Sequence, residues 1–361
     1  MVKLIEYRQL TSILAMFLIV QLAGLLVVFY LLTPAEVSIG PPGGGGSSIS
    51  VFLYFIYLIA AAVAMFFLFK RYHGPLLFKG IEAVVVVSAA FYLFVIILSA
   101  LFPNGSYYVF GAALAASVVL IAAKNKWQWL RNFTAIVASV GVGVVLGVFF
   151  GFTAALVFMA LVAAYDYVAV FVTKHMITLG RESVNRNLAF MVGTYDVEVV
   201  PRSYLKAKEA SMLGKELRST KDAALRKLIK SGSLPMPAFS ALGAGDLAIP
   251  LMVAVSAYVT FLSYFFSALI VACSCLGLIF AMYISKRYQM ALPAIPPLFA
   301  FVSVGLGIYV LITSPGNWHL YSLAFAEGVI VLAIMWITAV NRSRQGLGSR
   351  ITPRRPISSR S

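Results

Sequence analysis

Long apolar runs recur along most of this chain, and they limit its fold more than any other feature. Each reaches the length of about 18 residues or more that a helix needs to cross a bilayer. The chain has 361 residues, of which 61% are hydrophobic and 11% charged, whereas soluble domains carry about 25% charged residues. A transmembrane β-barrel would instead show short alternating segments. The sequence therefore predicts an all-α polytopic membrane protein.

About ten transmembrane helices are expected from the runs and their flanking charges. The first run does not resemble a signal peptide, because it is long and lacks a clear small-residue cleavage site. Only Gly151 marks a turn between the fifth and sixth spans. The predicted spans are 10–32, 50–69, 80–102, 107–123, 133–151, 152–177, 238–258, 262–285, 291–312 and 321–340.

The distribution of positive charge predicts the orientation. All 28 Lys and Arg residues precede the first span, lie in or beside every second connection, or follow the last span. The alternate connections, such as "PAEVSIGPPGGGGSS", "PNGSYY" and "SPGNWH", have none. The positive-inside rule therefore places both termini and the long loop after span six in the cytoplasm. This topology, with anionic lipid as the partner, explains the net charge of +16, so we expect no nucleic-acid partner.

The spans divide the chain into five segments. A hydrophilic cytoplasmic loop separates six spans from three, and a tenth span precedes a basic, disordered tail. The loop contains an expected amphipathic helix, which can lie on the membrane or pack on the inner ends of spans six and seven. Its apolar positions are Leu205, Met212, Leu217, Leu225 and Leu228, and Gly232 follows as a stop signal. The segments are 1–177, 178–237, 238–312, 313–340 and 341–361.

Four acidic residues fall inside predicted spans, where an ionisable group is a functional candidate. Glu82 lies three residues from Lys79 at the predicted cytoplasmic edge and is interpreted as an interface ion-pair partner. Glu327 is assigned pairing within the bundle and no sharper role. Asp166 and Asp246 lie on consecutive antiparallel spans, each about eight residues from the cytoplasmic boundary, or roughly 12 Å deep. These two carboxyl groups are therefore expected at the same depth.

Two buried carboxyl groups at one depth suit aspartyl hydrolysis. Two like charges so close together cannot both ionise, so the pair is expected to hold one proton. The ionised member takes a proton from water, and the protonated member polarises the scissile carbonyl group. Gly243 and Gly245 would let backbone, water or substrate approach Asp246. The alternative for these glycines is small-residue helix packing.

Three motifs resemble the presenilin and signal-peptide-peptidase family of Gly-x-Gly-Asp intramembrane aspartyl proteases. They are "YD" at Tyr165–Asp166, "GAGD" at Gly243–Asp246 and "ALPAIP" at Ala291–Pro296, on spans six, seven and nine. The resemblance covers spans one to nine and implies a presenilin-like bundle of six plus three spans. It implies that Asp166 and Asp246 are catalytic and that Tyr165 supports the first. It also assigns substrate binding to Pro293, Ala294 and Ile295.

The resemblance further implies transmembrane-helix substrates in the type I orientation, and it leaves a homo-oligomer open. The chain departs from the family pattern in three ways. Ile295 replaces the usual leucine, Ala244 fills the variable motif position, and the tenth span exceeds the usual nine. A second "YD", Tyr195–Asp196, lies in the polar loop and is not interpreted as catalytic.

Prolines at the start of span nine suggest how a substrate binds. Pro293, Pro296 and Pro297 are expected to break the helix, which is tolerated where backbone lines a wet cavity. We expect an unwound substrate to pair as a strand with backbone near Ile295 or the polar stretch before Ala241.

Other chemistries fit less well. No His-Glu-x-x-His pattern is present, no histidine lies deep in a span, and Cys273 and Cys275 have no metal-site partners, so neither a metal nor a cofactor is expected. Prepilin peptidases share a Gly-x-Gly-Asp aspartate but lack the Pro-Ala-Leu element. The rival from another class is a proton-coupled transporter or channel, in which the intramembrane aspartates relay protons. The protease and the transporter interpretations differ in one observable: a protease cuts peptide bonds, whereas a transporter leaves them intact.

Overall fold

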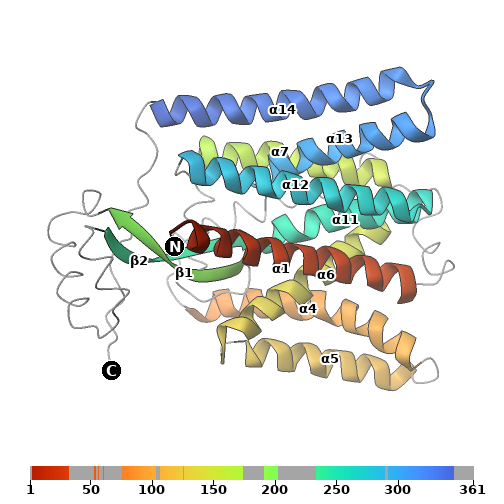
Figure 1. The fold of residues 1–361 in the computed structure, drawn as a ribbon. Helices are drawn as coiled ribbons and strands as arrows, with labels where there is room; N and C mark the ends of the chain where they lie inside the picture. Colours follow the sequence, from red (N-terminus) through yellow and green to blue (C-terminus); the bar gives the residue numbers. More distant parts are fainter. Residues whose placement is uncertain are drawn as a thin grey trace.

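The structure is a computed structural model that describes residues 2–31, 75–102, 106–124, 126–173, 191–201, 233–288 and 292–344, together with Leu53, Ile56 and Ala60. Within these ranges, nine helices form a bundle, and a β-hairpin extends from one end of it (Figure 1). The helices are α1 Val2–Leu31, α4 Pro75–Leu101, α5 Ser106–Ala123, α6 Gln128–Phe149, α7 Phe152–Phe171, α11 Ala244–Phe261, α12 Tyr264–Tyr288, α13 Ile295–Thr313 and α14 Trp318–Arg344. The hairpin strands are β1 Met191–Pro201 and β2 Ser233–Gly243.

The helical prediction is confirmed for most spans. Eight of the described helices are long and apolar enough to cross a membrane, and a shorter apolar helix, Tyr108–Ala123, coincides with the predicted span 107–123. The predicted span 50–69 lies outside the described residues, apart from Leu53, Ile56 and Ala60, which are helical. The predicted amphipathic helix after residue 202 also lies outside them. The predicted disordered tail 341–361 starts too early, because residues 341–344 belong to α14, and the rest of it lies outside the described residues.

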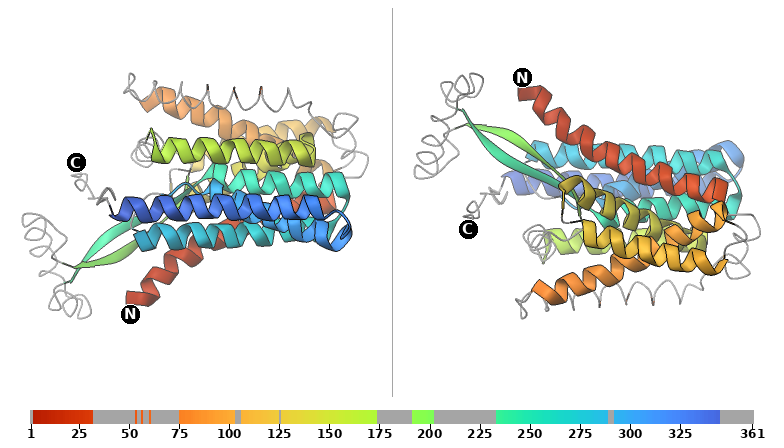
Figure 2. Two further views of the ribbon diagram at one scale, coloured as in Figure 1. Left: turned by 90° about the horizontal axis from the view of Figure 1, so that it is seen from above. Right: turned by 90° about the horizontal axis from the view of Figure 1, so that it is seen from below.

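Helix α11 lies inside the bundle, where it packs against α6, α12, α1 and α7. Helices α14 and α5 lie at opposite edges (Figure 1). The hairpin leaves the bundle at the end where α1 begins and α14 ends (Figure 2). Both ends of the helical part therefore lie on one side, as the predicted topology requires. That this side is cytoplasmic remains a prediction.

A two-residue turn joins α6 to α7. Phe150 and Gly151 both have extended backbone, with φ/ψ of −91°/126° and −61°/156°. The backbone N–H of Phe150 still bonds to the carbonyl of Leu146, so the helix ends abruptly. The turn that Gly151 predicted is confirmed, and it makes the two helices antiparallel neighbours in the sequence.

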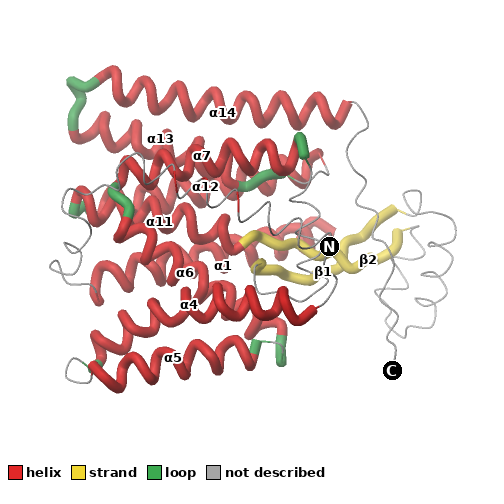
Figure 3. The backbone as a smooth tube through the Cα atoms, turned by 180° about the vertical axis from the view of Figure 1, so that it is seen from behind, coloured by secondary structure: helices red, strands yellow, loops and turns green. Residues whose placement is uncertain are grey.

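The hairpin changes the predicted boundary of span seven. Helix α11 begins at Ala244 rather than at residue 238, because residues 233–243 form strand β2. Strand β1 occupies part of the predicted polar loop, and Tyr195 and Asp196 pair there with Phe239 and Ala238 (Figure 3). Two prolines in residues 233–243 disfavour a helix there, and strand pairing supplies the backbone hydrogen bonds that a helix would otherwise provide.

The hydrogen bonds of Gly193 show how the ladder accommodates those prolines. The side-chain amide of Asn132, in α6, donates to the Gly193 carbonyl at 2.8 Å and accepts from its N–H at 3.2 Å. The backbone N–H and C=O of Gly193 therefore point away from its partner Ala241. In an antiparallel ladder the backbone groups of every second pair point outward in this way. Pro235 and Pro237 fall in this outward set, so the ladder with β1 needs no N–H from them.

Candidate active site

Asp246 lies in the first turn of α11, directly after β2. Its Oδ2 accepts a hydrogen bond from the backbone N–H of Gly243 at 3.2 Å. A Cβ on Gly243 would lie 3.2 Å from that same oxygen, so a larger residue would crowd the carboxyl group. A Cβ on Gly245 would meet nothing within 4 Å. Open space therefore adjoins Asp246 at Gly245, while Gly243 keeps Asp246 close to the backbone.

Asp166 lies on α7, and its side chain is only 6% exposed. Its Oδ2 accepts a long hydrogen bond of 3.4 Å from the backbone N–H of Ile295, the first residue of α13. The backbone N–H of Ala294 also interacts with this carboxyl group. Tyr165, the preceding residue, is half-buried and interacts electrostatically with Asp166. The start of α13 thus supplies backbone donors to Asp166.

The fold brings the two aspartates together. Helices α7 and α11 pack against each other, and Asp246 lies close enough to Asp166 to act on it electrostatically. Asp246 keeps part of its side-chain surface exposed. Within the described residues, neither aspartate has a cationic partner, and both accept bonds from backbone N–H groups. The arrangement is an uncompensated carboxyl pair on facing helices.

The predicted substrate-binding residues lie beside this pair. Pro293 is buried, Ala294 is half-buried, and Ile295 is 4% exposed. Helix α13 begins at Ile295 rather than at residue 291, so Pro296 and Pro297 occupy its first turn. A first helical turn needs no N–H donors, so these prolines start the helix instead of breaking it.

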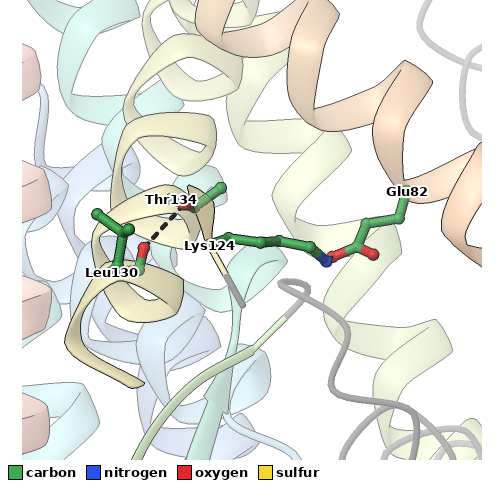
Figure 4. Close-up of polar contacts among 4 residues, drawn as sticks. All are labelled: Glu82, Lys124, Leu130 and Thr134. Atoms are coloured by element: carbon green, nitrogen blue, oxygen red, sulfur yellow. Dashed lines mark hydrogen bonds and ion pairs between the residues drawn. The ribbon is translucent and has the colours of Figure 1, made fainter. Parts of the chain in front are cut away.

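The other two intramembrane acids lie elsewhere. Glu82, on α4, is 1% exposed and forms an ion pair with Lys124, which follows α5 (Figure 4). An ion-pair role was predicted for Glu82, but its partner comes from 42 residues away and not from neighbouring Lys79. Burial lowers the pKa of Lys124, and the hydrogen bond to Glu82 opposes that effect. Glu327 is exposed on α14, and the predicted pairing within the bundle is not observed among the described residues.

Sequence reasoning missed three uncharged polar residues around the site. Gln21 of α1 and Ser139 of α6 bond to backbone carbonyls of α11, and Asn132 bonds to β1. A lone glutamine in an apolar run is a signal, because a buried amide needs a partner.

Comparisons with known proteins identify the family and the fold. Residues 14–314 match the family model described as signal-peptide peptidase, presenilin aspartyl protease. No curated protein matches significantly. Two solved structures of a presenilin family intramembrane aspartate protease, in space groups P2 and C222, have TM-scores of 0.54. Their identities are 20% and 18%, covering 84% of this chain and 97% and 99% of theirs, so they support the fold.

Helix α14 begins at Trp318, beyond the matched residues. No cluster of three or more His, Cys, Asp or Glu side chains able to hold a metal occurs in the described part of the chain. The family match covers most of the sequence and includes both aspartates and the start of α13. The chain therefore belongs to the signal-peptide peptidase and presenilin family of aspartyl proteases, and it is an aspartic endopeptidase embedded in the membrane.

Proposed function

We propose that the enzyme hydrolyses peptide bonds within transmembrane helices of membrane proteins, using Asp166, Asp246 and one water molecule. The observation that carries the proposal is the carboxyl pair on α7 and α11, whose members interact with each other and accept hydrogen bonds from backbone N–H groups, with no cationic partner among the described residues. Two such groups share a proton, so one can act as base while the other acts as acid. They titrate as a unit, and neither role is fixed to one residue.

The reaction proceeds by general acid–base catalysis. The ionised carboxylate takes a proton from water as the water oxygen attacks the scissile carbonyl carbon, and the protonated carboxyl donates to the carbonyl oxygen. Collapse of the tetrahedral intermediate breaks the C–N bond, and a proton passes to the departing amine. The backbone donors from Gly243 and Ile295 hold the two carboxyl groups in place for both steps.

The substrate is proposed to unwind and pair as a strand with β2. On β1, Asn132 already bonds to the outward backbone groups of Gly193. On β2, the backbone N–H and C=O groups of Phe239 and Ala241 belong to the outward set of the ladder. Pro237 and Pro235, also outward, have no N–H to offer. Pairing is therefore restricted to the part of β2 nearest Asp246, which places a bound strand beside the carboxyl pair.

The proposed orientation places both termini and residues 178–237 on the cytoplasmic side. It rests on the Lys and Arg distribution, and the shared end of α1, the hairpin and α14 is consistent with it (Figure 1). Substrates then meet the site from the bilayer, and cleavage occurs near the cytoplasmic boundary.

The test is cleavage of a tagged single-span substrate by the purified protein in detergent, with products identified by mass spectrometry. The wild type is expected to cut inside the span, and folded Asp166→Asn and Asp246→Asn variants are expected to be silent. Cleavage by either variant would show that the pair is not the catalytic unit. A wild type that transports protons in liposomes and leaves the substrate intact would support the transporter instead.

A further inference from the structure

We infer that Gln21 of α1 and Ser139 of α6 are positioning residues that fix the first turn of α11 and, through it, the Asp246 carboxyl group. The inference rests on the proposed function, in which Asp246 is one of the two catalytic acids. Both side chains act on backbone carbonyls beside Asp246.

Gln21 reaches α11 from the middle of a transmembrane span. Its side chain is completely buried, and its Nε2 donates to the carbonyl oxygen of Leu247 at 3.0 Å. Leu247 directly follows Asp246 in the chain and is itself fully buried. This bond joins residues 226 positions apart. It therefore ties the first transmembrane helix to the turn that carries the carboxyl group.

Ser139 of α6 contacts the same turn. Its Oγ lies 2.8 Å from the carbonyl oxygen of Ala135, in its own helix, and 3.2 Å from that of Ala244, the first residue of α11. The two carbonyls approached by Gln21 and Ser139 thus bracket Asp246, one before it and one after it. Two helices that are separate in sequence share the task of orienting one turn.

Pro250 gives this turn a particular need for outside donors. It lies inside α11 and has no N–H, so the carbonyl of Asp246, four residues earlier, loses its helical partner. A proline at this place also pushes the preceding turn away from ideal geometry. The first turn of α11 is therefore less constrained by its own helix, and the bonds from α1 and α6 to the neighbouring carbonyls of Leu247 and Ala244 restrain it from outside.

The backbones of α1 and α6 approach α11 closely enough for these contacts. A Cβ on Gly24 of α1 would lie 2.4 Å from the side chain of Leu251, and one on Gly143 of α6 would lie 2.7 Å from it. Gly24 and Gly143 are one turn beyond Gln21 and Ser139 on their respective helices. The two glycines set the separation of the helices, and the two polar residues set the position of the turn.

A purely structural role explains Gln21 poorly. Its Oε1 is buried and has no hydrogen-bond partner among the described residues. An unpaired buried acceptor destabilises a fold, so an apolar residue of the same size would serve packing better. Retaining the amide makes sense if its donor is needed at Leu247.

The test compares Gln21→Met, which keeps the length and loses the donor, and Ser139→Ala with Ser117→Ala and Ser274→Ala. The two control serines are equally buried, and each bonds to a carbonyl of its own helix, Ala113 or Ile270. Asp246→Asn is assayed in parallel. The measurements are kcat and KM for a single-span substrate, the pH–rate profile and the thermal unfolding temperature.

We expect Gln21→Met and Ser139→Ala to lower kcat by about 10- to 100-fold with little change in KM, because small displacements of a catalytic group have effects of this size. Their pH–rate profiles should be displaced from that of the wild type. Their unfolding temperatures should match those of the control serine variants, whose kinetics should be unchanged.

Two results would overturn the inference while leaving the proposed function intact, provided that Asp246→Asn is silent. One is wild-type kcat and an unshifted pH profile in both variants. The other is a loss of total activity that is fully explained by a smaller amount of folded protein. In that case kcat per folded molecule and the pH–rate profile would equal those of the wild type. Cleavage by Asp246→Asn would instead contradict the proposed function, and the inference would fail with it.

Discussion

Two regions of this protein bury acidic side chains within the membrane, and they treat the charge in opposite ways. Near the end of α5, Glu82 is paired directly with Lys124. On α7 and α11, Asp166 and Asp246 interact electrostatically, and within the described residues their hydrogen-bond donors are backbone N–H groups. A cation neutralises the first acid and makes it a part of the packing. The second region leaves two acids without a cationic partner among the described residues, which is what the proposed acid–base chemistry requires.

The contrast predicts a separation of effects. Removing charge from the aspartate pair should abolish activity without harming the fold. Removing charge from the Glu82 pair should harm the fold without changing the chemistry.

Asp166→Asn and Asp246→Asn are each expected to lower kcat by about 10³-fold or more, because a general acid–base unit fails when either member is lost. Thermal unfolding in detergent should occur at or above the wild-type temperature, since the amide relieves the repulsion between two buried acids. A large fall in unfolding temperature would show that these acids support the fold as Glu82 does.

Glu82→Gln is expected to destabilise the fold by about 3 kcal/mol, because it leaves the Lys124 ammonium group buried without its counter-charge. Thermal unfolding measures the loss, and kcat per folded molecule should be unchanged. The double variant Glu82→Gln/Lys124→Met should recover much of the stability, since neither charge is then left unpaired. A double variant as unstable as the single one would contradict this account.

Raising the pH should also rescue Glu82→Gln in part. Burial lowers the pKa of Lys124, and the variant loses the hydrogen bond that opposes this effect. The folded state then releases the Lys124 proton at a lower pH than the unfolded state does, so stability rises as the pH approaches the ordinary lysine range. Unfolding temperatures measured across alkaline pH, relative to the wild type, test the sign.

Pro293→Ala is expected to reduce kcat/KM by about tenfold while the protein stays folded. Pro293 is buried just before the backbone N–H groups that reach Asp166, and a looser chain there positions these donors less well. Pro315→Ala, in the exposed turn between α13 and α14, is the matched control. Equal cleavage by both variants would show that Pro293 does not constrain the site.

Arg342→Ala is expected to destabilise the protein by about 1 kcal/mol and to lower kcat only slightly. Arg342 of α14 donates to the Phe171 carbonyl at the end of α7, and its guanidinium lies 4.8 Å from the centre of the Phe171 ring. The Arg342 cation therefore contacts the carbonyl end of α7, the helix that carries Asp166. Arg287→Ala, at an exposed site on α12, should have no effect on thermal unfolding. A large loss of kcat would mean that Arg342 acts on the carboxyl pair.

Much of the architecture can be predicted from the sequence because long apolar runs in a bilayer must be helical. The structure brings Asp166 and Asp246 together as expected. The predicted depth of Asp246 is wrong in its derivation, because Asp246 lies in the first turn of α11 and not eight residues inside a helix. Gly151 also predicts the turn before α7 correctly.

The features that sequence reasoning missed depend on long-range contacts. Strand β2 needs a partner more than thirty residues earlier, in a stretch of mixed polar residues whose pattern resembles a loop. The ion pair of Glu82 with Lys124 and the bond of Gln21 to Leu247 join distant segments in the same way. Local patterns carry no information about which distant group satisfies a buried polar side chain.

The far end of the aspartate-bearing helices has a mechanical consequence. The backbone N–H of Phe152 bonds to Thr260 Oγ1 at 3.1 Å, and the Phe152 ring contacts Phe261 and Phe266. Asp166 lies about 21 Å along α7 from this contact, at 1.5 Å per residue, so a tilt of α7 relative to α11 about the contact would be amplified at Asp166. A change in tilt of about 3° would then move Asp166 by roughly 1 Å. Because helix tilt adjusts to bilayer thickness, the lipid chain length would then change the distance between the two carboxyl groups of the proposed catalytic pair.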